Sequence, residues 1–240
     1  MVVGLQPVRE AIRVHGAALR GLALDARDSP RVDALERFAR DHGVTRVERW
    51  PQGELDRLSS GVSHQGAATW APELQLTALD ELLADPNLIA LALDKIQDPQ
   101  NFGAVVRSAV GVAEAAVIWG EHAAAPLSTA MVRASAGAVE HARLCRVASL
   151  VTALSQAVAA GVRVVGLDAR APSALSELDL RVPTVLVIGA EHTGLGGAVR
   201  RSCSELARLV PTRKIDSLNA SVAAGVALYE VAIQRMKSAT

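Results

Sequence analysis

The second half of the chain alternates short apolar runs with longer segments whose apolar positions recur every three or four residues. Uninterrupted apolar runs of about five residues are typical of strands buried on both faces, and the longer periodic segments predict helices. Strands are predicted at 88–93, 115–119, 142–147, 162–167, 184–188 and 206–210, and helices at 101–112, 128–137, 150–160 and 219–236. This alternation predicts an α/β fold whose mostly parallel sheet is covered by helices on both faces.

The first part of the chain shows the same alternation on a smaller scale. Helices are predicted at 7–14 and 31–41, with a third beginning at 55–58, and strands at 22–24 and 44–50. A polar segment bounded by glycines at 61–66 predicts a loop, and a short helix at 78–84 lies in a region typical of a linker. The predicted organisation is therefore a small α/β domain at 1–72, a linker at 73–86 and a larger α/β domain at 87–240.

Composition narrows the class of protein. A chain of 240 residues of which 50% are hydrophobic can bury a sizeable core, which excludes disorder and fibrous repeats. No apolar run reaches the roughly 20 residues of a membrane span, and the first residues lack a signal-peptide pattern, so a soluble cytoplasmic protein is expected. Cys145 and Cys203 lack zinc-ligand spacing. They are expected as two thiols, with a bond between them as the alternative.

The net charge is zero, which is the main argument against a nucleic-acid partner, because affinity for phosphates comes largely from basic residues. Charge can nevertheless be sorted between faces of a protein. Only Lys95, Lys214 and Lys237 are lysines, so nearly all cations are arginines. Arginine forms forked contacts with phosphate and stacks on bases, which keeps an RNA partner open.

Three unusual segments follow predicted strands, where open α/β sheets bind their ligands. The first is 94–107. Pro99 ends its loop, Asn101 is expected to cap the next helix, Gly103 allows close approach, and Arg107 is expected in the first or second turn. The alternative interpretation is a capped helix with a solvated arginine.

The second segment, 188–197, is a glycine-rich turn that contains a carboxylate, Glu191. It lacks the GK[ST] ending of a phosphate loop and the glycine spacing of a dinucleotide fingerprint. A carboxylate in such a turn needs hydrogen-bond partners or a function, so the turn is a candidate site.

The third segment, 210–230, combines an unusual loop with the start of a helix. Ser217 and Asn219 offer capping groups. Apolar side chains share one helical face, and small residues elsewhere allow tight packing: Val222, Val226, Tyr229 and Ile233 form the first set, and Ala220, Ala223, Ala224, Gly225 and Ala227 the second. An amphipathic terminal helix with a polar cap is the alternative, but it leaves the loop unexplained.

Together the segments resemble the three motifs of the SpoU/TrmH family, a branch of the SPOUT methyltransferases. The matching residues appear in the family's order: Asn101-Phe102-Gly103 with Arg107, Gly189-x-Glu191-x-x-Gly194, and Ser217-Leu218-Asn219-x-Ser221. The resemblance covers about 88–235. The first domain is similar to the SpoU substrate-binding domain, through Gly4-Leu5-Gln6-Pro7-Val8 and His64-Gln65-Gly66.

The resemblance implies a catalytic domain with a SPOUT-type parallel sheet and a deep trefoil knot, preceded by a ribosomal-protein-like α/β domain. It implies S-adenosylmethionine as cofactor, held largely by main chain around Gly189, Val210 and Leu218, with a further contribution from the turn after 164–167. It also implies a homodimer in which Arg107 of one subunit meets the cofactor of the other. No metal is required, and Asp94 and Asp98 do not form a convincing ligand cluster.

The implied reaction is methylation of a ribose 2′-hydroxyl, with Asn101, Arg107, Glu191, Ser217 and Asn219 as the catalytic set. Asn101 orders the first loop, Glu191 holds its turn and bonds Asn101 or the substrate, and Ser217 and Asn219 shape the pocket. Arg107 has two alternative roles. It accepts the proton in an unusually dry interface, or it stays cationic and stabilises the developing alkoxide, because a guanidinium is normally always charged.

Two positions depart from the family, and the target has alternatives. His192 stands where many members have glycine, and Thr212 where methionine is common. Because of its first domain the chain is closest in layout to the RlmB-like group, which implies a guanosine of 23S rRNA as target. A tRNA target is the alternative within the same chemistry. Different classes are an inactive RNA-binding or ribosome-assembly protein and an unrelated small-molecule enzyme, which only the neutral charge favours.

Overall fold

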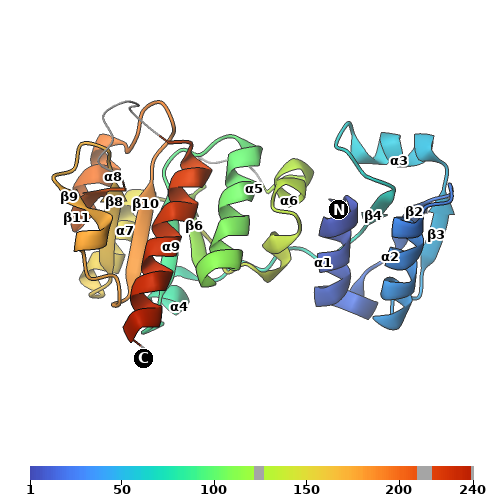
Figure 1. Cartoon of the computed structure of the whole chain (residues 1–240), viewed down its shortest axis with the longest axis horizontal. Helices are drawn as coiled ribbons and strands as arrows, with labels where there is room; N and C mark the ends of the chain where they lie inside the picture. The colour runs from blue at the N-terminus through green and yellow to red at the C-terminus, as the bar shows by residue number, and fades with distance from the viewer. Residues whose placement is uncertain (122–126, 210–217, 239–240) are drawn as a thin grey trace. The chain divides into compact units, whose positions relative to one another are not determined.

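The computed structural model describes residues 1–121, 127–209 and 218–238. Two compact units make up the chain (Figure 1). The first consists of Met1–Leu74 together with Leu127–His141, and the second of Gln75–Pro126 together with Ala142–Thr240. The segment Leu127–His141 comes from the half of the chain that was predicted as the catalytic domain.

The second unit is built on a seven-stranded sheet whose paired strands are all parallel. The strand order is β7-β6-β5-β10-β8-β11-β9. The strands are β5 (Ile89–Leu93), β6 (Ala116–Gly120), β7 (Leu144–Val147), β8 (Arg163–Leu167), β9 (Ser173–Ala174), β10 (Thr184–Ile188) and β11 (Glu205–Arg208). The predicted α/β fold with a parallel sheet is confirmed.

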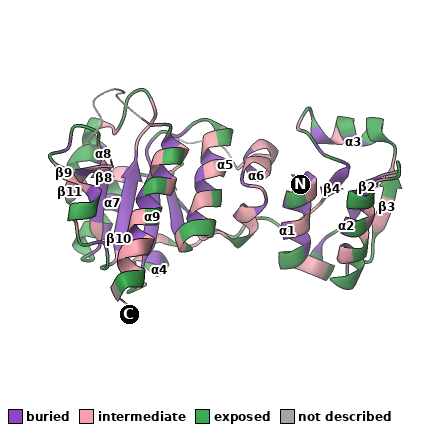
Figure 2. Ribbon diagram, viewed as in Figure 1, coloured by how far each residue is buried: buried purple, intermediate pink, exposed green. Residues whose placement is uncertain are grey.

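Helices cover both faces of this sheet, as the uninterrupted apolar strands require. Figure 2 shows the central strands buried and the helices exposed on their outer sides. On one face, α4 (Leu79–Leu83), α7 (Leu150–Ala159) and α8 (Gly197–Arg201) contribute to one core cluster with alternate residues of β5, β8 and β10. On the other face, α5 (Pro99–Ser108), a π-helical turn (Ala109–Ala113) and α9 (Ala220–Ser238) pack together.

Helix α9 buries one face and exposes the other. Ala220, Ala224, Ala227, Leu228 and Val231 are buried, whereas Val222, Val226, Tyr229 and Met236 are exposed. The alanines let α9 lie close to α5, and Gly225 lies near Ser108 there. Of the predicted apolar face, Val222, Val226 and Tyr229 are exposed, whereas the buried face combines alanines with Leu228 and Val231.

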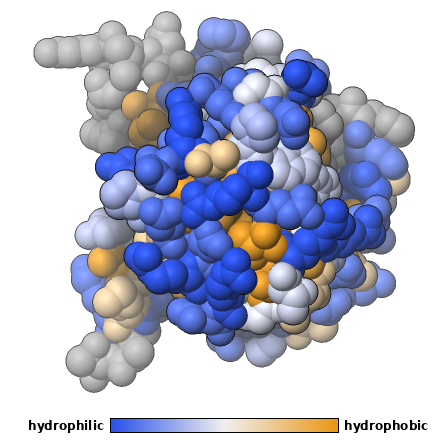
Figure 3. Space-filling model, turned by 90° about the vertical axis from the view of Figure 1, so that its right-hand side faces the viewer, coloured by the Kyte–Doolittle hydropathy of each residue, from blue (hydrophilic) through white to orange (hydrophobic). Residues whose placement is uncertain are grey.

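The first unit contains a four-stranded mixed sheet. Its order is β1-β4-β2-β3, in which β2 and β3 are parallel and the other pairs antiparallel. The elements are β1 (Val2–Val3), α1 (Leu5–His15), a short 3₁₀ turn (Gly16–Ala18), β2 (Leu22–Asp25), α2 (Pro30–Asp41), β3 (Val47–Trp50), α3 (Gln52–Ser59) and β4 (Ala67–Thr69). The face of this unit in Figure 3 is covered mostly by hydrophilic residues.

The segment Leu127–His141 packs on α1 and β1 within the first unit. It forms α6 (Thr129–Ala134) and a 3₁₀ turn (Ala138–His141). Glu10 pairs with His141 over 3.0 Å, and His15 pairs with Glu140 over 2.8 Å. A side chain at Gly137 would collide with Glu10 and Pro7, so the two segments approach as closely as a glycine allows.

The remaining differences from the predicted elements concern short segments. The strands β1, β4 and β9 and the helix α8 were not predicted. Two to five residues are too few to show a hydrophobic period. The helix predicted at 128–137 ends earlier, at Ala134, because Ala136 and Gly137 adopt left-handed backbone angles.

The two cysteines are free thiols in the structure. Burial raises the pKa of both Cys145 and Cys203 to about 11, so neither is an activated nucleophile. Among the described helices, none is long and apolar enough to cross a membrane.

Arg235 fastens the end of α9 to the sheet and generates a stability prediction. Its guanidinium donates to the carbonyl oxygens of Asn87, Leu88, Leu180 and Val182 at 2.7–3.2 Å. Burial lowers the pKa of Arg235 from its ordinary value. Arg235→Met leaves four partly buried carbonyls without this donor, so we expect the free energy of unfolding to fall by about 2–3 kcal/mol.

Urea-induced unfolding followed by circular dichroism measures this change. Lys237→Met is the matched control, because Lys237 is exposed on the last turn of the same helix. A control change as large as that of Arg235→Met would contradict the assignment.

Candidate active site

The candidate site lies at the carboxyl ends of the two central strands. β5 and β10 are adjacent and in register, with Leu93 opposite Ile188. Beyond that pair, the Asp94 amide still donates to the Ile188 carbonyl over 2.8 Å. The first two predicted segments therefore leave the sheet side by side, and they belong to the edge where parallel sheets bind ligands.

A ring of hydrogen bonds joins all three predicted segments. Asn101 Nδ2 donates to Glu191 Oε1 over 3.0 Å, and Asn219 Nδ2 donates to Asn101 Oδ1 over 2.9 Å. Asn219 Nδ2 also donates to Glu191 Oε1. The structure thus brings together residues separated by up to 118 positions in sequence. The predicted bond between Glu191 and Asn101 is present.

The ring leaves one oxygen of Glu191 available. Oε1 accepts from Asn101, from Asn219 and, over 3.4 Å, from the amide of Ala220. Oε2 has no hydrogen-bond partner within the described ranges. Three donors on one oxygen fix the orientation of the carboxylate. Oε2 can therefore accept a hydrogen bond from a ligand.

Asp98, not Asn101, caps α5, which corrects the prediction. Asp98 accepts from the amides of Gln100 and Asn101 at 3.0 and 3.3 Å. Pro99 occupies the first helical position, which proline favours, and so the cap falls on the residue before it. The side chain of Asn101 is consequently free to reach Glu191.

Asn219 does cap its helix, as predicted. Its Oδ1 accepts from the amides of Ser221 and Val222 at 2.9 and 3.3 Å and from the Ser221 hydroxyl at 2.6 Å. The capping bonds fix the amide orientation, so Nδ2 must point toward Asn101 and Glu191. One side chain thus starts α9 and completes the ring.

The turn that carries Glu191 is too tight for side chains at its base. A Cβ at Gly189 would lie 2.3 Å from the carbonyl carbon of Gly194. The Gly194 amide donates back to the Ala190 carbonyl over 2.8 Å, and Gly194 has φ +63°. Glycine at these positions lets the turn close and present Glu191 on its tip.

Asp94 is a positioning residue whose role was not predicted. Its buried carboxylate accepts from the Gly196 amide over 2.7 Å and thereby ties the first loop to the second. The next residue, Lys95, is held at φ +62°, which is unusual for a side chain other than glycine. An aspartate directly after a fully apolar strand was the signal for it in the sequence.

Arg107 does not join the ring. It lies in the last turn of α5, not in the first two turns as predicted, because the helix begins at Pro99. Six residues of helix place it about 9 Å along the axis from Asn101. Arg107 is exposed and has no hydrogen-bond or ion-pair partner in the described part of the chain.

The predicted cofactor residues are described in part. Val210, Ser217 and the family departure Thr212 lie outside the described residues. Leu218 is half-buried directly before Asn219, and His192 is exposed. Gly166, in the strand before the turn that was predicted to contribute, has its Cβ direction blocked by Leu206, Leu195 and Cys203, and is thus a packing position.

The turn at 189–197 is suited to bind a ligand through main-chain groups. Four of the residues 189–197 are glycines, so amides and carbonyls of the turn are little covered by side chains. Leu195 and Leu218 are half-buried and offer apolar contact beside them. Within 1–121, 127–209 and 218–238, no three His, Cys, Asp or Glu side chains gather as a possible metal site.

Comparison with known proteins decides the family. The model of the SpoU rRNA Methylase family matches residues 88–229, more than half of the chain. The chain belongs to this family. The match spans all three segments of the ring.

Relatives resemble the chain over nearly its whole length. An uncharacterized tRNA/rRNA methyltransferase of Mycobacterium ulcerans is 38% identical over 98% of this chain and 77% of the relative. A crystal structure of an RNA 2′-O ribose methyltransferase has a TM-score of 0.81 and 25% identity, covering 98% of this chain and 88% of the other. The SpoU methyltransferase AviRb from Streptomyces viridochromogenes, in complex with AdoMet, has a TM-score of 0.77 and 27% identity, covering 98% and 90%.

The ring predicts energetic coupling between its members. We expect Asn101→Ala and Glu191→Ala each to destabilise the SpoU-family domain, and the double variant to lose about 1 kcal/mol less than the sum, because the shared bond is lost only once. Urea unfolding of the wild type, both single variants and the double variant measures this coupling. His192→Ala, exposed in the same turn, is the control, and we expect it to act additively with Asn101→Ala. Additivity of the Asn101 and Glu191 variants would show that the ring is not formed.

Proposed function

We propose that the protein transfers a methyl group from S-adenosylmethionine to a ribose 2′-hydroxyl of RNA. The observation that carries the proposal is the ring of Asn101, Glu191 and Asn219, which joins three family segments at the ligand-binding edge of the sheet. The methyl donor supplies an activated methyl group on sulfur. The residues of the chain hold the acceptor ribose and move its proton.

Glu191 orients the acceptor in this scheme. Its Oε2, left without a partner by the described residues, accepts a hydrogen bond from a ribose hydroxyl, while Oε1 stays fixed by three donors. Asn101 and Asn219 are positioning residues, because they act through Glu191. Holding the hydroxyl in line with the methyl group accelerates the reaction, because the reacting atoms are already oriented for transfer.

The proton of the hydroxyl passes along its hydrogen bond to Glu191 Oε2 as the oxygen attacks, and Arg107 stabilises the negative charge that develops on that oxygen. A guanidinium keeps its proton under ordinary conditions, so the cationic role requires no unusual environment. The position of Arg107, in the last turn of α5 and apart from the ring of its own chain, favours action across a subunit interface. We therefore assign this role to the partner subunit's Arg107.

A homodimer supplies that interface. Val222, Val226 and Tyr229 form an exposed apolar stripe at helical spacing on α9, and α9 packs beside the helix that carries Arg107. Apolar stripes of this kind favour association of helices. Pairing two copies through α9 buries the stripe and brings Arg107 near a second site.

The finer parts of the proposal concern fold and target. We propose that the chain forms the deep trefoil knot of SPOUT enzymes around the cofactor, and that the first unit, residues 1–72 in the predicted boundaries, recognises RNA. A guanosine of 23S rRNA is the proposed target. The naming of relatives as tRNA/rRNA methyltransferases supports a tRNA target as well.

Mass mapping of cellular RNA tests the function. In cells that lack the gene, we expect one 2′-O-methyl group to disappear from ribosomal RNA and to return on expression of the wild type. Glu191→Ala is expected not to restore it, because the acceptor loses its orienting carboxylate. The matched control Glu81→Ala, an exposed carboxylate on α4, is expected to restore it.

The outcomes separate the alternatives. Loss of a methyl group from tRNA, in place of ribosomal RNA, would identify tRNA as the substrate. Unchanged ribosomal and transfer RNA would contradict the enzyme activity and leave the inactive assembly protein or the small-molecule enzyme. Restoration by Glu191→Ala would remove Glu191 from the mechanism.

The pH profile of Arg107→Lys tests the cationic role. Lysine keeps the charge but loses the forked geometry, so we expect kcat to fall by about 10–100-fold with an unchanged profile up to about pH 9. A new limb in the profile near the pKa of the lysine would instead identify residue 107 as proton acceptor. Full activity would exclude both roles. Arg146→Lys, an exposed arginine on β7, is the control.

A further inference from the structure

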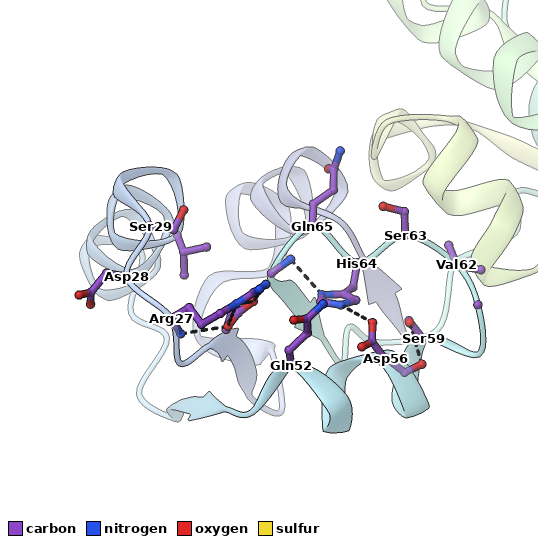
Figure 4. Close-up of a pocket in the computed structure, with 14 residues that line it drawn as sticks. Arg27, Asp28, Ser29, Gln52, Asp56, Ser59, Val62, Ser63, His64 and Gln65 are labelled. Carbon is purple, nitrogen blue, oxygen red and sulfur yellow. Dashed lines mark hydrogen bonds and ion pairs between the residues drawn. The ribbon is translucent and has the colours of Figure 1, made fainter.

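The first unit contains a polar cleft far in sequence from the family segments. It has a volume of about 620 Å³ and lies where β2 and β3 end in parallel, at Asp25 and Trp50. The starts of α2 and α3 and the loop 61–66 complete its walls (Figure 4). A cleft of this size at the carboxyl ends of parallel strands is large enough for a nucleotide.

Asp25 and Arg27 form a neutral pair in the cleft. The buried Asp25 carboxylate accepts from the Arg27 guanidinium at 2.7 and 3.2 Å and from the Arg27 amide at 3.0 Å. The guanidinium bond is the main cause that lowers the pKa of Asp25, so the pair stays ionised. The Arg27 side chain is 66% exposed, so much of it can be reached from solvent.

His64 is locked in one tautomer. The Gly66 amide donates to His64 Nδ1 over 2.9 Å, so Nδ1 must be unprotonated. The proton therefore lies on Nε2, which donates to Asp56 Oδ1 over 3.0 Å. Gly66 is required in this loop, because it has φ +85° and a Cβ there would lie 3.0 Å from Val32.

Asp56 and Gln52 supply the free polar groups of the cleft. Both come from α3, and both point toward His64, whereas Asp28 is turned away from it (Figure 4). Among the described residues, Asp56 Oδ2 and the Gln52 amide have no hydrogen-bond partner. Both side chains are exposed, that of Asp56 by 57%, so the α3 wall of the cleft offers a ligand a carboxylate oxygen and an adaptable amide.

Charge decides which ligand fits. With Asp25 paired with Arg27 and His64 Nδ1 acting as an acceptor, the carboxylates of Asp56 and Asp28 give the cleft a negative charge. A phosphate is repelled there, whereas a group with adjacent hydrogen-bond donors is attracted. Among the RNA bases only guanine presents two adjacent donors, its ring N–H and its amino group, on the edge that pairs with cytosine. Unpaired bases are the ones whose edges a protein can read in this way.

We infer that this cleft binds an unpaired guanine nucleotide of the RNA substrate, other than the nucleotide whose ribose is methylated. The guanine edge donates to Asp56, Gln52 contacts the remaining polar atoms, and the exposed side chain of Arg27 stacks on the base or meets its phosphate at the rim. That the guanine belongs to an RNA substrate rests on the proposed function. That the cleft binds guanine does not depend on it. In this inference the first unit recognises one unpaired base of the RNA.

Nuclear magnetic resonance with nucleoside monophosphates tests the cleft directly. The full-length ¹⁵N-labelled protein is titrated with GMP, AMP, CMP, UMP and inorganic phosphate. We expect GMP to shift the amide signals of Gly61 and Gly66, and Asp56→Asn to weaken GMP about tenfold or more while it keeps the acceptor for His64. The matched control Glu54→Gln, a carboxylate on the same helix outside the cleft, is expected to bind GMP as the wild type does.

Four results would overturn the inference. They are equal shifts with inorganic phosphate, equal shifts with the other nucleotides, an Asp56→Asn variant that binds GMP like the wild type, and no shift with any nucleotide.

Methyl-transfer kinetics separate this inference from the proposed function. With ribosomal RNA from cells lacking the gene, we expect Asp56→Asn to raise the KM for RNA about tenfold, with kcat and cofactor affinity unchanged. Glu54→Gln is expected to change neither. An unchanged KM would contradict the cleft's role in RNA binding. If the wild type transfers no methyl group to any RNA, the proposed function fails, and the GMP titration still decides whether the cleft binds guanine.

Discussion

The parallel pairing of β5 with β10 is the constraint on which the site depends. The register that sets Leu93 against Ile188 makes both following loops leave the sheet at one edge, and the Asp94 amide extends the ladder by one bond. Side chains from the two loops then lie within hydrogen-bond distance without any long reach. A slip of this register by one residue would turn the strand side chains to the opposite face and separate the loops. The core of the sheet and the geometry of the site are therefore fixed by the same bonds.

Helix α9 has a buried face and an exposed face with different surroundings. Alanines on its inner face let it pack closely on α5 and the sheet, and Arg235 fastens its far end to four carbonyls. At its near end Asn219 both caps the helix and closes the ring. Val222, Val226 and Tyr229 remain exposed on the opposite face, and the proposed dimer would bury them. Packing inside the subunit and the proposed association would thus use different residues of one helix.

The neutral charge of the chain has a structural explanation. Many arginines are paired within the first unit, as Arg27 is with Asp25 and Arg49 with Asp33 and Glu36. The two carboxylates proposed to bind ligands, Glu191 and Asp56, are instead held by neutral donors, and each has one oxygen without a partner among the described residues. Fixed acceptors of this kind recognise hydroxyl, amino and ring N–H groups, which RNA offers beside its phosphates. A net charge of zero is therefore compatible with an RNA partner whose sugars and bases are read.

The sequence by itself determined the alternation of apolar strands and helices, the three unusual segments and the family they resemble, because a buried parallel sheet demands apolar strands and a tight turn demands glycine. It did not determine which polar residue would cap α5, since Asp98 and Asn101 are both good caps and only the place of Pro99 in the folded helix decides between them. Nor did it place Leu127–His141 in the first unit, because the pairs of Glu10 with His141 and His15 with Glu140 join residues more than 120 positions apart. Which oxygens of Glu191 and Asp56 lack a partner among the described residues was likewise decided by tertiary structure alone. How many further hydrogen bonds a carboxylate can accept depends on which donors, distant in sequence, reach it in the fold. A local sequence pattern does not predict those donors.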